Sequence, residues 1–539
     1  MQRYIQKLEE GRDLSPKEAE AAVDKILSTA NDEEIGAFLL ALRAKGENLS
    51  EYKLFVQRIG LVGITNILVA ISSIILLPIL TKNLSTSDYG IWNQVNITLI
   101  LISNIAQVGL SYAMNRFLAG ETDKTKIQEG VYSILAVVLG VSLVVAGALY
   151  IFSNEIGFLL LNNNHSVALL LPLTIIMSNM TFISLDFFRT FQKTRKYSIF
   201  YLSRSYLVLI FASVLLLLGY GIWGCVFGIL ISYTLLMVVM FAIIVSEIGF
   251  KIPRFKNIRE YLNLSLPMVP GMVSSWIVDS SDRYVIGILL GTVFVGYYSA
   301  GYTLGTTIQL LVAPFSVLLL PVLSKNYEDK RKVKTVVKYS LRYYLALSIP
   351  AVFLLSILSK PILNILTTAE IASNGFLITP LVALGALLFG LYTILSQIII
   401  LTKKTKIIGV VWIIAAIINV ALNMIAVPFI GIIGAALVTL VTYTVTLAFI
   451  LVYSSRYMTL PFDLGFIVKS IFASAVAGAF VFLLNPQSLL GIVIVAILGV
   501  ILYTIVLIIS KGFEKKEINF FMGFLRDILK DLKSMTARF

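Results

Sequence analysis

Charged side chains inside the long apolar runs of this 539-residue chain are few, and they are the first candidates for chemistry. A charged group is costly in a hydrocarbon environment, so its presence there indicates a function by default. Asp279, Asp282 and Arg283 lie in one such run. On a helix, Asp279 and Arg283 are four residues apart and can pair, with Asp282 beside the same face. Two interpretations stay open: the three groups neutralise one another and lock two halves of the molecule together, or Asp279 and Asp282 bind a proton or Na⁺.

Arginines form a second group of candidates. A guanidinium binds an oxyanion such as phosphate through two parallel hydrogen bonds, so we predict that Arg116, Arg204 and Arg283 contact an anionic ligand. Arg116 and Arg189 stand at the C-terminal end of their apolar runs, and Arg342 stands at the start of its run, so all three are close to the predicted cytoplasmic boundary. Their long side chains can reach the membrane surface, so anchoring is the alternative for these three. Arg204 lies about two helical turns inside its run, where this alternative is weaker.

Uncharged amides gather in the first two apolar runs. They are Asn66, Asn93, Gln94, Asn96, Asn104 and Gln107. Hydrogen bonds between helices explain some of them, but helix packing alone needs fewer. We therefore predict that Asn66, Asn93 and Gln107 belong to a polar binding site.

No catalytic constellation is visible. The chain has one cysteine, Cys225, and one histidine, His165, which excludes an internal disulfide framework and a histidine-based metal cluster. It also lacks a Gly-rich nucleotide loop with its lysine, so it cannot by itself be an ATP-driven pump. We expect no enzyme activity, no cofactor and no metal centre.

The elements that must position these residues are membrane-spanning helices. Hydrophobic residues make up 58% of the chain, charged residues 13%, and the mean hydropathy is +0.91, whereas soluble domains carry about 25% charged residues. Apolar runs of about 20 residues, each long enough to cross a bilayer as a helix, follow one another. We predict an all-α membrane protein of about fourteen spans. The predicted spans are 58–81, 91–118, 129–152, 167–189, 198–219, 222–246, 263–289, 293–320, 339–358, 374–401, 406–427, 431–453, 464–484 and 487–510.

Lys and Arg alternate along the polar joints between these spans. Every second joint is rich in them, whereas the intervening joints hold almost none apart from Lys82 and Lys360. Positively charged joints face the cytoplasm, so both termini are expected there, in a multi-pass protein of the cell membrane. The net charge of +14 then indicates contact with anionic lipid rather than nucleic acid.

A short motif occurs twice in the chain. Leu84 to Trp92 reads LSTSDYGIW, and Leu290 to Tyr298 reads LGTVFVGYY. Six spans separate the copies, and an even number keeps the same orientation, so we predict two pseudo-symmetric six-helix lobes around a cavity. The predicted units are a soluble helical N-terminal unit at 1–50, lobes at 51–250 and 251–455, two additional spans at 456–511, and an amphipathic cytoplasmic tail at 512–539.

Proline and glycine predict weak points in two spans. Pro267, Pro270 and Gly271 interrupt the start of span seven, and Pro314 and Pro321 interrupt span eight. Proline removes a hydrogen bond from the helix ladder, so these positions are expected to act as hinges.

The first 48 residues resemble the N-terminal helical subdomain of anthranilate phosphoribosyltransferase. The likeness is carried by Asp13-Leu14-Ser15 and by the run from Ala37 to Gly46. The Gly-rich phosphate loop of that family would have to follow, and it does not. We therefore interpret the segment as a fused or truncated fragment without catalysis.

The membrane part resembles the polysaccharide-export (Wzx-type) flippases, over about residues 52 to 510. The resemblance rests on Leu84 to Trp92, followed by Gly109-Leu110 and Arg116-Phe117, and on Asp282-Arg283-Tyr284 with Val295-Gly296-Tyr297-Tyr298. It implies alternating access in a monomeric transport unit that moves an oligosaccharide on a polyprenyl phosphate or diphosphate. Membrane lipids and glycan-assembly enzymes are the expected partners. The alternative is a cation-coupled multidrug or small-solute exporter of the related superfamily, which would need an acidic cavity.

Overall fold

The computed structural model describes residues 2–10, 18, 21–22, 49–325, 329–402, 404–513 and 517. Every regular element among them is a helix. Ten helices are long and apolar enough to cross a membrane, or eleven if a bent pair counts as one span. Large apolar side chains cover much of the outer surface of these helices, as expected of a surface in contact with lipid chains. The chain is an all-α, multi-pass membrane protein, as predicted.

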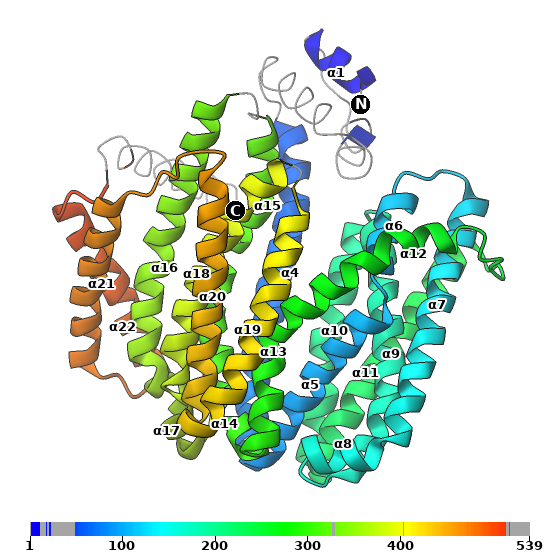
Figure 1. Cartoon of the computed structure of the whole chain (residues 1–539), viewed down its shortest axis with the longest axis horizontal. Coiled ribbons are helices and arrows are strands. Elements are labelled where there is room, and N and C mark those ends of the chain that lie inside the picture. Colours follow the sequence, from blue (N-terminus) through cyan, green and yellow to red (C-terminus); the bar gives the residue numbers. More distant parts are fainter. Residues whose placement is uncertain are drawn as a thin grey trace, which may run out of the picture.

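The first lobe comprises the helices that follow the N-terminal helix α1 (Gln2–Glu9) up to residue 248. They are α4 (Leu49–Asn83), α5 (Thr86–Ala106), α6 (Leu110–Leu118), α7 (Lys124–Ile151), α8 (Ser153–Leu160), α9 (His165–Thr190), α10 (Thr194–Leu215), the π-helical turn η1 (Leu216–Tyr220) and α11 (Gly221–Ile248). Figure 1 shows this lobe beside the second one, with α4 between them.

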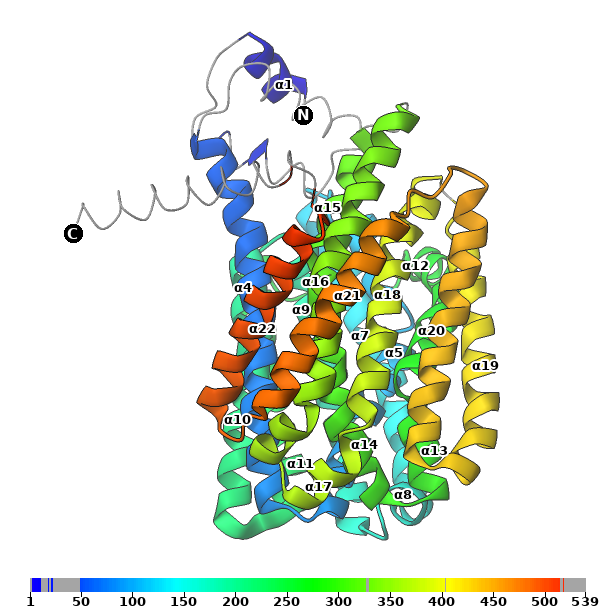
Figure 2. The same cartoon turned by 90° about the vertical axis from the view of Figure 1, so that its left-hand side faces the viewer.

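The second lobe repeats the arrangement and adds a C-terminal pair. Its elements are α12 (Ile258–Ser265), η2 (Leu266–Met268), α13 (Val269–Leu289), α14 (Thr292–Gly305), η3 (Thr306–Leu311), α15 (Ala313–Lys325), α16 (Lys330–Leu366), α17 (Ala369–Gly375), α18 (Ile378–Leu401), α19 (Lys406–Ile430), α20 (Ile432–Ser455), α21 (Leu464–Leu484) and α22 (Leu489–Ile509). The last two pack against α16 on the outside of this lobe (Figure 2).

Helices lie on all fourteen predicted ranges, although the number of membrane crossings stays a prediction. One of the ten helical stretches, the 55 residues Thr194–Ile248, contains two of the predicted spans. Gly219 and Gly221 have positive φ values of 90° and 56°, and the chain reverses there between α10 and α11, which pack together. Helix α16 is longer than the predicted span 339–358, because it extends from Lys330 to Leu366. The sequence analysis also missed the short helices α8 and α17.

Two ends of the molecule differ in charge. Connections at one end, the basic end, hold or directly precede lysines and arginines, as at 191–193 and 249–257. Connections at the other end, the neutral end, contain no charged residue. They are 84–85, 161–164, 216–220, 290–291, 367–368, 431 and 485–488. Figure 1 shows α8 and α17 at the neutral end and α6 and α12 at the basic end.

Three spans are broken toward the basic end. Pro267 lies in η2, which separates α12 from α13 and confirms the predicted interruption of span seven. Span eight breaks earlier than predicted, at η3, and Pro314 occupies the first turn of α15, where proline is tolerated. Span two also bends, by 50° between α5 and α6, at Gly109, whose φ is 68°.

Two glycines of the repeated motif allow the lobes to touch at the neutral end. A Cβ atom at Gly90 would lie 1.9 Å from the main-chain oxygen of Thr292, and one at Gly296 would lie 2.5 Å from that of Thr86. Gly90 and Gly296 occupy the same motif position, as do Thr86 and Thr292. The contact of α5 with α14 is therefore reciprocal, like a two-fold interface within one chain.

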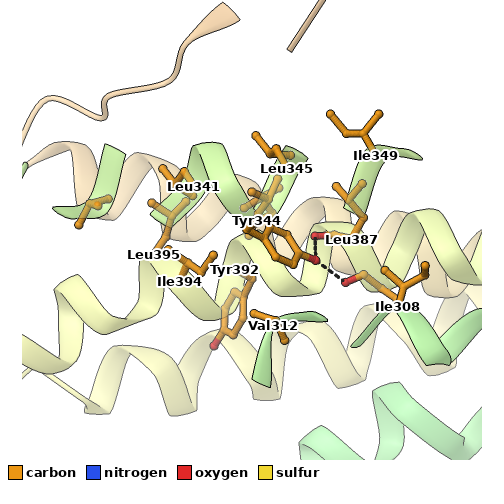
Figure 3. Close-up of a cluster of buried hydrophobic side chains, with 14 of the residues drawn as sticks. Ile308, Val312, Leu341, Tyr344, Leu345, Ile349, Leu387, Tyr392, Ile394 and Leu395 are labelled. Carbon is orange, nitrogen blue, oxygen red and sulfur yellow. Dashed lines mark hydrogen bonds between the residues drawn. The ribbon is translucent and has the colours of Figure 1, made fainter. Parts of the chain in front are cut away.

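The second lobe has a large apolar core between α16 and α18. Figure 3 shows its buried side chains. Tyr344 lies among them with its ring fully buried, and its hydroxyl donates to the main-chain oxygen of Leu387 at 3.0 Å. A buried hydroxyl needs such a partner, so this bond fixes the ring and aligns α16 with α18.

Replacing Gly90 by Val tests the contact between the lobes. The new side chain would collide with the main chain of α14, which cannot yield as a flexible side chain can, so we expect a loss of about 1–3 kcal/mol in unfolding free energy. Thermal unfolding in detergent, followed by circular dichroism, measures it. Gly140→Val in α7 is the control because a Cβ there meets nothing within 4 Å. Equal melting temperatures for the two variants would contradict the proposed contact.

Candidate functional site

A cavity of about 370 Å³ lies between helices of the first lobe and reaches α14 of the second. Arg204 is the only charged residue in its lining. The lining residues are Val69, Ser72, Ser73, Leu76, Leu77, Leu80, Tyr89, Trp92, Asn93, Asn96, Leu99, Ile100, Phe182, Arg204, Ser205, Val208, Tyr233 and Thr303. Helices α4, α5 and α10 supply most of them, so the cavity combines one cation with amides, hydroxyls and aromatic rings.

Arg204 is held by aromatic rings rather than by a carboxylate. Its guanidinium carbon lies 5.0 Å from the ring centre of Phe182 and 4.9 Å from that of Tyr201. Within the described residues it forms no ion pair. A contact with a ring face does not use the N–H groups of a guanidinium, and those of Arg204 have no hydrogen-bond partner among the described residues. The group is thus positioned to receive an anion.

Asn93 and Asn96 line the same cavity from α5. Their amide nitrogens donate to the main-chain oxygens of Tyr89 and Trp92, each at 2.8 Å. This direction turns each side-chain oxygen away from its own helix. Asn93 is therefore in the same cavity as Arg204, and the two are the predicted site residues that this cavity brings together.

The other six predicted site residues lie outside this lining. Asn66 is exposed on α4, seven residues before Ser73 and thus on the same helix face, toward the basic end. Gln107 is at the bend of span two, where its Oε1 accepts a hydrogen bond from Ser111 at 2.9 Å. Arg116 is exposed near the end of α6 at the basic end.

Arg283 and Asp282 form a buried ion pair in α13. Arg283 Nη1 is 3.1 Å from Asp282 Oδ1, and Asp282 also accepts hydrogen bonds from the Arg283 main-chain N–H and the Tyr298 hydroxyl. The expected pairing of Arg283 with the Asp279 carboxylate does not form, because Nη1 donates instead to the Asp279 main-chain oxygen at 3.0 Å. The centre of the Tyr302 ring lies 3.9 Å from the guanidinium carbon of Arg283 and completes the enclosure of this side chain.

Asp279 has a different environment from Asp282. Its Oδ1 accepts a hydrogen bond from the Tyr443 hydroxyl of α20 at 2.6 Å. No cation lies within ion-pair distance of this carboxylate among the described residues. Asp279 is half-buried, whereas Asp282 is fully buried. Of the two predicted coupling residues, only Asp279 therefore keeps a carboxylate without a cationic partner.

Arg342 proves to be a structural residue at the basic end of the second lobe. Its guanidinium bonds to Asp463 Oδ2 at 2.5 Å, to Glu517 Oε2 at 3.0 Å and to the main-chain oxygen of Gly512 at 2.6 Å. These contacts join α16 to the segment before α21 and to the segment after α22. Most of the predicted tail at 512–539 and of the N-terminal unit at 1–50 lies outside the described residues.

The chain belongs to the polysaccharide biosynthesis protein family, whose model matches residues 55–327. The MatE family model matches residues 267–425. The probable low-salt glycan biosynthesis flippase Agl15 of Haloferax volcanii is 24% identical over 289 residues, which are 52% of this chain and 61% of the flippase. The chain thus aligns with less than two thirds of the length of that curated relative.

Solved structures share the fold. The lipid II flippase MurJ in an inward closed conformation superposes with a TM-score of 0.66 and 21% identity, covering 84% of this chain and 98% of MurJ. A multidrug resistance MATE family transporter of the MOP superfamily, inward-facing, gives 0.61 and 14% identity, covering 72% and 94%. The predicted resemblance is confirmed at the level of family and fold.

The N-terminal resemblance is also confirmed. The model of the glycosyl transferase family helical bundle domain matches residues 2–58. Anthranilate phosphoribosyltransferase of Methanosarcina barkeri is 75% identical over 57 residues, which are 11% of this chain and 16% of the enzyme. The match ends where the membrane part begins.

Removing one charge of the buried pair tests its role. Asp282→Asn leaves the Arg283 cation buried without a counter-ion, so we expect a loss of about 3–5 kcal/mol in unfolding free energy. Replacing both residues, as Asp282→Leu with Arg283→Met, should cost less than either single change because no charge stays buried. Chemical unfolding in detergent measures all variants. A double variant whose loss equals the sum of the single losses would show that the pair is not coupled.

Proposed function

We propose that this protein is a flippase that moves an oligosaccharide on a polyprenyl phosphate or diphosphate across the cell membrane. The observation that carries the proposal is the cavity in which Arg204, without a carboxylate partner among the described residues, shares the lining with amide groups inside a multi-pass membrane fold. An anionic head suits the arginine, a glycan suits the amides, and the lipid tail can stay in the bilayer. The flippase names of Agl15 and MurJ support this proposal.

Transport would proceed by alternating access. The reciprocal contact of α5 and α14 closes the lobes together at the neutral end. The breaks in spans two, seven and eight lie toward the basic end, where the chain can bend. By the positive-inside rule the basic end faces the cytoplasm, with both termini. The cavity would load from the cytoplasmic side and discharge when the neutral end parts.

Other features of the chain fit a transporter without an enzyme activity of its own. We propose that the 1–50 unit is a fragment without catalysis, since residues after it match a membrane family and no phosphate loop follows. The expected partners are the lipid-linked oligosaccharide, membrane lipids and enzymes of glycan assembly, with one chain as the transport unit.

The second candidate is a cation-coupled exporter of drugs or small solutes. The MatE match and the MATE-like fold favour it. Such a carrier for cationic drugs needs an acidic cavity, and the cavity described here contains Arg204 and no carboxylate. Asp279 and Asp282 lie on α13, outside its lining. The charge of the cavity therefore favours the flippase.

Arg204→Gln tests the proposed role of the cavity. In a strain lacking this gene, lipid-linked sugars should accumulate in the inner leaflet, and the restored gene should remove them. The variant loses a charge-assisted contact, so we expect about a tenfold or greater fall in transport rate at subsaturating substrate. Mass spectrometry of the lipid-linked sugars and analysis of surface glycan measure the outcome.

The control for this experiment is Arg195→Gln, an exposed arginine at the start of α10, which should behave like the unaltered protein. Normal surface glycan in the deletion strain would end the flippase proposal. A deletion strain with normal glycan but increased sensitivity to cationic drugs would support the exporter.

We also propose that Asp279 couples an ion to transport. Among the described residues its carboxylate has one neutral hydrogen-bond partner, Tyr443, and no cation, so binding of a proton or Na⁺ would change its charge and its contact with α20. Asp279→Asn should abolish the dependence of transport on the ion gradient in proteoliposomes. Glu155→Gln, exposed on α8, is the control. An unchanged gradient dependence in Asp279→Asn would refute this coupling role.

A further inference from the structure

The two walls of the Arg204 cavity have opposite hydrogen-bonding character. The acceptor wall is the set of lining side chains on α4 and α5 whose oxygen atoms can accept hydrogen bonds, and the donor wall is the set on α10 whose N–H and O–H groups can donate them. On α4 and α5 this polarity follows from the hydrogen bonds that the side chains already donate to their own helix, and on α10 it follows from the guanidinium of Arg204, which can only donate. It restricts the ligand more than the charge of Arg204 alone does.

The acceptor wall is built by four side chains. Asn93 and Asn96 each use an amide N–H on the main chain of α5, and their Oδ1 atoms have no partner among the described residues and are not enclosed. The hydroxyls of Ser72 and Ser73 both donate to the main-chain oxygen of Val69, at 2.7 and 3.4 Å. A hydroxyl that has spent its hydrogen can only accept.

The donor wall is built by Arg204 and Ser205 on α10. The guanidinium N–H groups of Arg204 have no hydrogen-bond partner among the described residues. The hydroxyl of Ser205, the next residue, also forms no hydrogen bond there and can donate one. The neighbouring Tyr206 hydroxyl donates to the main-chain oxygen of Leu68 at 3.3 Å. This bond ties α10 to α4 beside the cavity.

Size narrows the ligand further. A volume of about 370 Å³ is at the lower end of ligand sites, which span about 300–1,000 Å³. It provides room for one sugar residue and an attached anionic group, not for a whole oligosaccharide. The remaining sugars of a longer glycan must lie outside this cavity.

We infer that this cavity recognises a single sugar residue that carries an oxyanion, with the oxyanion at Arg204 and the sugar hydroxyls donating to Asn93, Asn96, Ser72 and Ser73. The inference rests on the proposed flippase function and specifies which part of its substrate is read. The oxyanion is either the phosphate that links the first sugar to the lipid or the carboxylate of an acidic sugar. Trp92 lies in the same lining and supplies a fluorescent reporter.

Binding of matched soluble probes tests this inference. The full-length protein is placed in nanodiscs of phosphatidylcholine, and quenching of tryptophan fluorescence is measured with glucose 1-phosphate, glucuronate, glucose and inorganic phosphate. Glucose 1-phosphate or glucuronate should bind about tenfold or more tightly than glucose or phosphate, because only they use both walls. The tighter of the two identifies the source of the oxyanion. The Trp92→Phe variant should lose the signal.

Variants separate the two walls. Arg204→Gln should reduce the affinity for glucose 1-phosphate to that for glucose, and Asn93→Leu with Asn96→Leu should reduce it to that for inorganic phosphate. Arg195→Gln should change neither. The comparison of probes on the unaltered protein needs no variant, so misfolding of a variant cannot decide the result.

Two results would overturn the inference: inorganic phosphate that binds as tightly as glucose 1-phosphate, or the absence of quenching by every probe. The flippase proposal is judged separately by the accumulation of lipid-linked sugars. Two-walled binding without flipping would leave the inference standing and reject the proposed function. If the Asn93→Leu, Asn96→Leu variant still flips the lipid-linked sugar and its probe binding is unchanged, the inference about the cavity is rejected and the proposed flippase function stands.

Discussion

The close approach of α5 and α14 at the neutral end is the constraint on which the remaining architecture depends. Main-chain oxygens of one helix occupy the space that a side chain at Gly90 or Gly296 would fill on the other. Because the contact is reciprocal, it fixes both lobes symmetrically about one crossing point. The polar half of α5, with Asn93 and Asn96, directly follows this point. The position of the cavity wall is thus determined by the same crossing.

In the second lobe, Asp282 and Arg283 form a buried ion pair, whereas Arg204 in the first lobe forms no ion pair among the described residues. Asp282 and Arg283 satisfy each other with the help of Tyr298, which suits a rigid joint beside α5. Arg204 receives only aromatic faces. An unpaired cation inside a membrane protein is costly, and it is retained where a ligand completes it. Arg283 therefore has a structural environment, whereas Arg204 is the residue proposed to bind a ligand.

The sequence predicted the helical class, the two lobes and the repeat, because apolar length and charge alternation are local signals. It also named Arg204 and Asn93, which the structure places in the lining of one cavity. It could not tell that Arg283 is enclosed by Tyr298 and Tyr302, since those contacts depend on how α13 packs against α14. Ser72, Ser73 and Ser205 were missed, because a serine in an apolar helix looks the same whether it faces lipid or a cavity. The bend at Gly109 could have been predicted, because a glycine inside an apolar run is a common site of helix interruption.

Helix α16 has 37 residues, so it is about 55 Å long at 1.5 Å per residue, whereas the hydrocarbon core is about 30 Å thick. Its excess length lies at the basic end, where Arg342 fastens it to the chain on both sides of the C-terminal helix pair. A rigid rod that protrudes from the bilayer behaves as a lever arm. A tilt of about 10° about its far end displaces the tip by about 10 Å, so a small rocking of the second lobe becomes a large stroke in the aqueous phase.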